Sequence, residues 1–375
     1  MKRFSVLFAG VLLAMTVPVA AFAQLSFGGY YRAGGIYVAP ASGTSTLTFS
    51  DRLRLNVAFA SANDLYGFKF RLQGNGSTSG PGAGGSSGIY NAFTNAGTLQ
   101  YGFGYMTFLD KKLKLSAGVL DVTDYEVAQH VGNLYLGNVF TDETKPGSPV
   151  LGGEKGNTTG AMAQLEPVTG LSIGIYSRIA GTDLSVSDLG IAASYVIPNT
   201  GKIIVDSSLG NYASASNDIG KSRVTGVFSF TGVKGLSATA GVRYDGHTAF
   251  GNANNGAIGA LAIVEYTTGP LFVDLAADLD LTNSAQYVES EVDYKIIPPL
   301  TLRAYGAYDS SALYAKAGST GAAVANNEMI GADLVFPFTV PASAGSPSTS
   351  AELDAGIVYG NKSNIGVPVL VKVNF

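Results

Sequence analysis

The 375-residue sequence contains no cysteine, no tryptophan and only two histidines. Without cysteine the fold has no disulfides, and the thiolate ligands common in zinc sites are missing. His130 and His247 lie in no recognisable motif, and both are expected in loops. The sequence therefore indicates neither a Ser/His/Asp catalytic assembly nor a transition-metal site, and we expect no enzyme activity and no cofactor.

Charged residues are also scarce, at 13% of the chain against the usual quarter. The 23 Lys and Arg are outnumbered by 27 Asp and Glu, so there is no basic excess that would attract nucleic acid. No apolar run of 18 residues occurs after residue 23, and no transmembrane helix is predicted. A chain that is rich in apolar residues but never continuously apolar fits strands with one face in lipid.

The first 23 residues have the features of a secretory signal peptide. Lys2 and Arg3 supply positive charge, Phe4–Val17 forms the apolar stretch, and Ala21-Phe22-Ala23 matches a small-x-small cleavage site. A transmembrane anchor would need a longer apolar run. We therefore expect an exported protein whose residues 24–375 form one domain.

The last eleven residues, Ile365–Phe375, alternate with a period of two. Four valines and Phe375 share one parity, whereas Gly366, Pro368 and polar residues fall mostly on the other. This period places one set on each face of a β-strand, and about ten alternating residues can cross a bilayer as a tilted strand. The 20 Tyr and 19 Phe would supply the aromatic girdles of such a structure.

The same alternation recurs along the chain and predicts 18 strands. The clearest segment is 46–60, in which Leu47, Phe49 and Leu53 lie opposite Thr48, Ser50 and Arg52. The predicted strands are 25–38, 46–60, 66–73, 99–109, 113–119, 159–166, 171–180, 187–197, 202–211, 221–231, 235–245, 256–268, 270–281, 286–297, 299–309, 327–338, 350–360 and 365–375.

Short and long connections alternate between these segments. Short turns with Pro or Gly are predicted at 166–170, 197–201, 231–235, 267–270 and 297–299, with mostly longer polar loops between them. Residues 338–350 would form a long turn on the short-turn side, and 74–97 a flexible loop. The longest interruption, 121–158, has a mixed composition that favours an ordered loop, with room for a short helix.

This pattern predicts a transmembrane antiparallel β-barrel of 18 strands, with 16 as the nearest alternative. An even number returns both termini to the side of the short turns. A soluble β-sandwich, β-helix or propeller would need a buried core or a fixed repeat, and nearly every segment offers only one apolar face. A barrel of 16 to 18 strands encloses an aqueous channel, which predicts passive diffusion of small hydrophilic solutes and ions.

The whole chain after residue 23 resembles a Gram-negative outer-membrane porin in its signal peptide, strand rhythm, terminal Phe375 and long loop after the fifth strand. The resemblance implies an outer-membrane location and a homotrimer. It also implies recognition of Phe375 by the barrel-assembly machinery. In general porins the corresponding loop folds into the lumen, so residues 121–158 would form the constriction.

Charged residues of the predicted inner face fall into two groups. Those of the first three strands are basic: Arg32, Arg52, Arg54, Lys69 and Arg71. Those of strands twelve to fourteen are acidic: Glu265, Asp274, Asp278, Asp280, Glu289, Glu291 and Asp293, with Asp121, Asp124, Glu126, Asp142 and Glu143 added by the long loop. Roughly opposite walls would set up a transverse field. Alternatively, these charges only hydrate the wall and pair with neighbouring strands.

Two other functions stay open from the sequence alone. A substrate-specific, sugar-type channel would also suit 18 strands, with Tyr30, Tyr176 and Tyr305 as inward stacking surfaces. A plugged barrel with a structural or adhesive role would use the same outer face and different loops.

Overall fold

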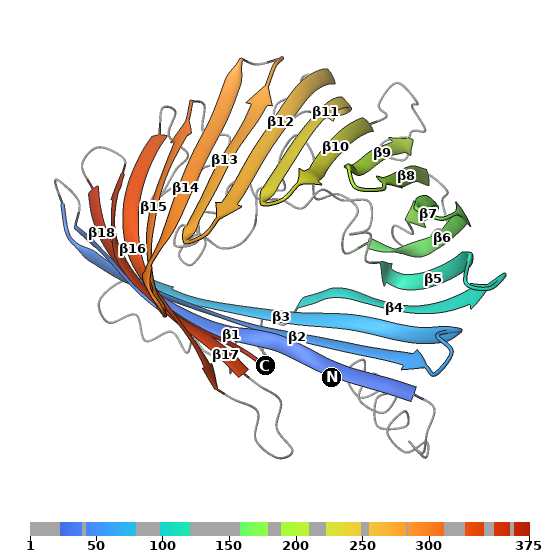
Figure 1. Ribbon diagram of the computed structural model, residues 1–375, viewed down its shortest axis with the longest axis horizontal. Coiled ribbons are helices and arrows are strands. Elements are labelled where there is room, and N and C mark those ends of the chain that lie inside the picture. The colour runs from blue at the N-terminus through green and yellow to red at the C-terminus, as the bar shows by residue number, and fades with distance from the viewer. Residues whose placement is uncertain are drawn as a thin grey trace.

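The chain forms a single ring of β-strands in a computed structural model (Figure 1). The structure describes residues 23–39, 43–79, 98–120, 158–178, 189–209, 223–248, 255–282, 284–310, 327–340, 349–360 and 364–375. Its strands are β1 (Ala23–Ala39), β2 (Thr46–Ser61), β3 (Tyr66–Ser79), β4 (Thr98–Phe108), β5 (Leu113–Leu120), β6 (Thr158–Val168), β7 (Leu171–Arg178), β8 (Leu189–Ile197), β9 (Gly201–Leu209), β10 (Arg223–Val233), β11 (Leu236–Thr248), β12 (Asn255–Thr268), β13 (Leu271–Asp280), β14 (Ala285–Ile297), β15 (Leu300–Asp309), β16 (Asn327–Val340), β17 (Thr349–Gly360) and β18 (Asn364–Asn374).

Every strand pairs antiparallel with its neighbours in sequence, and β1 also pairs with β18. The sheet is therefore a closed barrel of 18 strands, which confirms the predicted fold and strand number over the alternative of 16. Within the described part of the chain, no helix is long and apolar enough to cross a membrane.

Alternate residues point to opposite faces of the ring. On β18, Val369 is 44% exposed, whereas its neighbour Leu370 is 1% exposed. On the other strands too, large apolar side chains with high exposure occupy the outward-facing positions, for example Val205 on β9, Leu275 on β13 and Ile357 on β17. In lipid this outer surface is covered by hydrocarbon, as the alternation predicts.

Exposed tyrosines lie near both ends of the barrel. The end with the short connections is called the turn end here, and the opposite end the loop end. Tyr66, Tyr195, Tyr266 and Tyr294 lie near the turn end, and Tyr37, Tyr244, Tyr308 and Tyr359 near the loop end. Two girdles of amphipathic rings are the expected arrangement at two membrane interfaces.

The short turns lie where they were predicted. Gly170, Gly235 and Gly269 have φ between 53° and 85°, a left-handed conformation that glycine adopts without steric cost. Asn199 takes the same conformation in the turn after β8, with a φ of 59°. The turn after β14 contains the Pro298–Pro299 pair.

Some segments are more extended than predicted. β3 continues through the Gly- and Ser-rich residues to Ser79, because these residues pair with β2 as far as Thr48. β16 and β17 extend to Val340 and Thr349, so only 341–348 of the predicted long turn lie outside the described residues. His247 lies within β11 and not in a loop. Residues 1–22, 80–97 and 121–157, including His130, lie outside the described residues.

The C-terminal residue helps to close the ring. Phe375 N donates to Gly29 O at 3.1 Å, and Gly29 N donates to Phe375 O at 2.9 Å. The next residues inward continue the pairing of β18 with β1, from Tyr30↔Asn374 to Ala39↔Ile365. The backbone of Phe375 is therefore part of the final strand pair.

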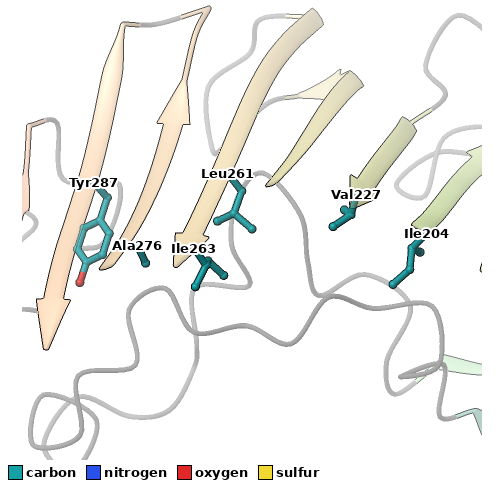
Figure 2. Packing of buried hydrophobic residues seen from close by; sticks show 6 residues of the cluster. All are labelled: Ile204, Val227, Leu261, Ile263, Ala276 and Tyr287. Carbon is teal, nitrogen blue, oxygen red and sulfur yellow. The ribbon is translucent and has the colours of Figure 1, made fainter. Parts of the chain in front are cut away.

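Two apolar clusters lie on the inner parity, although nearly every segment was expected to offer an apolar face on one side only. Ile204, Val227, Leu261, Ile263, Ala276 and Tyr287 form one cluster on β9–β14 (Figure 2). Phe103, Tyr105, Leu120, Met162, Tyr176 and Ala192 form the other, on β4–β8. The expectation of a single apolar face was wrong for these strands, because direct pairs such as Val227↔Ile204 and Ile263↔Ala276 place apolar side chains side by side on the inner face.

Inner tyrosines pack over glycines of the adjacent strand. A Cβ atom on Gly190 would overlap the ring of Tyr176, and one on Gly331 would overlap the ring of Tyr305. Each glycine leaves the space that lets the neighbouring ring lie against the wall.

Gly190→Ala is expected to lower the stability of the barrel by about 1–3 kcal/mol, because the added methyl must displace the ring of Tyr176. The unfolding temperature of the folded band in heat-dependent gel electrophoresis would measure it. Gly226→Ala is the matched control, since its Cβ would meet nothing within 4 Å. Equal unfolding temperatures for the two variants would contradict the packing argument.

Candidate pore lining

The basic residues predicted for the pore lie on the inner face of adjacent strands. Arg32 is on β1, Arg52 and Arg54 are on β2, and Lys69 and Arg71 are on β3. Arg32 pairs with Arg52 on one side and with Lys372 of β18 on the other. Lys372 and Lys114 of β5 extend this group, which is called the basic region below.

Tyr30 lies at the centre of the basic region. The guanidinium carbons of Arg54 and Arg32 are 5.1 and 5.9 Å from its ring centroid, and Lys372 Nζ is 5.5 Å away. Cations at this distance are attracted to the negative face of an aromatic ring. One ring thus helps to hold three cations from three strands close together.

Neutral hydrogen-bond acceptors fix two of the arginines. Arg54 donates from Nε and Nη2 to Gln73 Oε1 at 2.9 and 2.5 Å. Arg71 Nε donates to Asn56 Oδ1 at 2.7 Å, and its guanidinium lies 4.7 Å from the ring centroid of Tyr101. These contacts orient the side chains without adding negative charge.

Exposure differs among the basic residues. Lys69 is exposed and Arg54 and Arg71 are partly exposed, whereas Arg52 is only 3% exposed. Of the predicted set, Arg52 therefore has the least contact with the solvent inside the barrel.

Acidic residues converge on one arginine of β15. Arg303 donates to Asp293 Oδ1 from Nε at 2.9 Å and to Asp293 Oδ2 from Nη2 at 3.0 Å. Glu291 Oε1 is 3.1 Å from Arg303 Nε. Glu291 also pairs in register with Asp274 of β13. This group, with Asp333 and Asp354, is called the acidic region below.

Asp333 and Asp354 were missed as site residues from the sequence. They are 1% and 0% exposed and lie on the inner parity of β16 and β17. The same alternation that located the earlier acids would have located these, had it been followed beyond the fourteenth strand. Glu352 of β17 pairs in register with Lys372, so the two charged regions meet at β17 and β18.

Seven predicted acids cannot be placed as side chains. Asp121, Asp124, Glu126, Asp142 and Glu143 lie outside the described residues. Asp278 and Asp280 lie in β13, and only their backbone is described.

The inward tyrosines differ in their availability for stacking. Tyr176 and Tyr305 are 5% and 4% exposed, and their hydroxyls donate to Asp206 and Asp333 at 3.4 and 3.3 Å. Their rings lie against the wall, so they offer little surface to a sugar. Tyr30 is partly exposed but is already in contact with cations.

The acidic region runs over β13–β17, and β17 is next to β18, which carries Lys372 of the basic region (Figure 1). The two regions are thus neighbours around the ring and not opposite walls, and charges of opposite sign create a field between them. Among the described residues, no group of three His, Cys, Asp or Glu is placed to hold a metal ion. The chemistry that this arrangement offers is electrostatic attraction and orientation of solutes.

The fold is that of solved porin structures, with low sequence identity. A BenF-like porin of Pseudomonas fluorescens has a TM-score of 0.54 at 11% identity, over 94% of this chain and 98% of that one. OpdQ of Pseudomonas aeruginosa has a TM-score of 0.53 at 9% identity with the same coverage. OccK2 (OpdF) of P. aeruginosa, solved in complex with glucuronate, has a TM-score of 0.51 at 10% identity, over 94% and 96%. No protein-family model matches the sequence, and no curated protein matches it.

Arg303→Ala is expected to destabilise the barrel by about 3–5 kcal/mol, because it leaves buried carboxylates without their cation. The midpoint of denaturant unfolding in detergent micelles would measure the loss. Arg71→Ala is the control, since Arg71 bonds a neutral amide. If both variants unfold at the same denaturant concentration, the ion pairs at Arg303 do not stabilise the fold.

Proposed function

We propose that this protein is a passive, water-filled channel for small hydrophilic solutes and ions in the outer membrane. The observation that carries the proposal is the closed ring of 18 strands with an apolar outer face. A ring of this size is wide enough for an aqueous channel, and its outer face suits hydrocarbon. Basic and acidic regions on the inner face add a means of selecting solutes.

The cellular context of the proposal comes from the sequence. Residues 1–23 would direct export and be removed, and Phe375 would be recognised by the barrel-assembly machinery. The chain would then function as a homotrimer, as in the general porins it resembles. Residues 121–158 would narrow the lumen.

A substrate-specific channel is the second candidate. It is favoured by the row of cations around Tyr30, which would attract the carboxylate of an acidic solute. The glucuronate bound to OccK2 (OpdF) is a solute of this kind. Saturable solute flux would support this candidate over non-specific diffusion.

Single-channel recording in planar bilayers tests the main proposal. The refolded protein should produce large, stable and nearly ohmic current steps, because a charged aqueous lumen conducts ions of both signs. Closure in groups of three would support a trimer. Folded protein that inserts into the bilayer without conducting would contradict the proposal and favour a plugged, structural or adhesive barrel.

The basic region should set the preference for anions. The triple variant Arg52→Ala, Arg54→Ala and Arg71→Ala removes three positive charges and should move the zero-current potential toward cation selectivity. We expect a shift of about 10 mV or more at a tenfold salt gradient, for which the potential of a perfectly selective channel is about 59 mV in magnitude. Lys234→Ala, in the turn after β10, is the control. An unchanged potential would remove these arginines from the conduction path.

A further inference from the structure

Tyr30 lies on the inner face of β1, between two strands that also carry cations there. It pairs in register with Arg54 of β2 on one side and with Asn374 of β18 on the other. One level toward the loop end, Arg32 of β1 pairs with Lys372 of β18. Side chains two residues apart on a strand lie on the same face, so Arg32 and Lys372 lie beside the ring. Three strands therefore bring three cations to one aromatic side chain.

The three cations are close enough to repel one another. From the ring centroid, the distances are 5.1 Å to Arg54, 5.9 Å to Arg32 and 5.5 Å to Lys372. No two of these charges are therefore more than 11.4 Å apart, which is the sum of 5.9 and 5.5 Å. Salt screens partly buried charges much less than exposed ones. Holding the cations together therefore needs an attraction that offsets their repulsion.

The ring of Tyr30 supplies such an attraction. Its π-electrons attract a cation that lies within about 6 Å of the centroid, and all three cations lie within that distance. A carboxylate in the same place would also attract them, but its negative charge would cancel part of theirs. The neutral ring gathers positive charge and adds no charge of its own.

Neighbouring strands add further contacts to single members of this group. Arg54 donates to Gln73 of β3, and Lys372 pairs in register with Glu352 of β17. The ring of Tyr30, by comparison, contacts all three cations. Tyr30 and the three cations are each partly exposed on the inner face, so a dissolved anion can approach them. An anion at this position would be attracted by three charges at once.

We propose that Tyr30 is a positioning residue for anion passage, whose ring holds Arg32, Arg54 and Lys372 together as one anion-attracting group. The proposal deepens the channel function proposed above and rests on it. It differs from the sequence-based expectation that Tyr30 stacks on a sugar, because the ring is in contact with cations. The arginines and the lysine carry the charge that anions meet, and Tyr30 determines how closely that charge is gathered.

Replacing the ring tests its role. Tyr30→Leu removes the π-electrons but keeps an apolar side chain, so the three cations should move apart. The ratio of anion to cation permeability, taken from the zero-current potential in a tenfold KCl gradient, should then fall by about twofold or more. Tyr30→Phe keeps the ring and should retain the wild-type ratio. Tyr37→Leu is the matched control, because Tyr37 is on the same strand and faces outward with 47% exposure.

A double-mutant comparison shows whether Tyr30 acts through the cations. Arg32→Gln with Arg54→Gln removes two of the three charges, and Tyr30→Leu is then added. The ring has only Lys372 left to hold in this background, so Tyr30→Leu should change the permeability ratio less than it does in the wild type. An equal fold-change in both backgrounds would overturn the proposal, because Tyr30 would then act independently of the arginines.

The outcomes separate this proposal from the channel function. Conducting Tyr30→Leu channels with the wild-type ratio would overturn the proposal and leave the channel function intact. The same loss in Tyr30→Phe as in Tyr30→Leu would also overturn it, because the hydroxyl and not the ring would then be responsible. Tyr30→Met is a second ring-free variant for the case in which Tyr30→Leu does not fold, as judged by heat-dependent gel mobility. Wild-type protein that inserts into the bilayer without conducting would contradict both proposals.

Discussion

Closure of the backbone hydrogen-bond network is the constraint on which the rest of the structure depends. In hydrocarbon an unpaired N–H or C=O costs several kcal/mol, so a sheet can span a membrane only without free edges. Pairing of β1 with β18, completed by the mutual bonds of Gly29 and Phe375, removes the last edge. A closed ring has an inside and an outside, and successive residues therefore meet different surroundings. The alternation of apolar and polar residues follows from that geometry.

The inner charges are held in two physically different ways. Arg54 and Arg71 donate to neutral amides and lie over aromatic rings. The acidic region is organised around the cation Arg303, which offsets part of its charge and links strands β14 and β15. Arg303 therefore has a stabilising role as the cation that the surrounding carboxylates share.

The number and parity of the strands could be predicted because a period of two is a local property of the sequence. Strand ends in glycine-rich segments could not, since Ser79 is held in β3 by its partner on β2 and not by its own preference. The burial of Tyr176 was equally hidden, because it depends on the register that brings Gly190 opposite the ring. The basic cluster could be predicted from three consecutive strands. The acids around Arg303 were only partly predicted, because the inward-facing positions were not traced beyond the fourteenth strand, and Asp333 and Asp354 lie on β16 and β17.

Two kinds of glycine occur in the barrel wall. Gly190 is small because a ring of the adjacent strand occupies the space above it. Gly104 faces outward under open space, so packing within the chain does not explain its size. Only the first kind is a requirement of the strand packing.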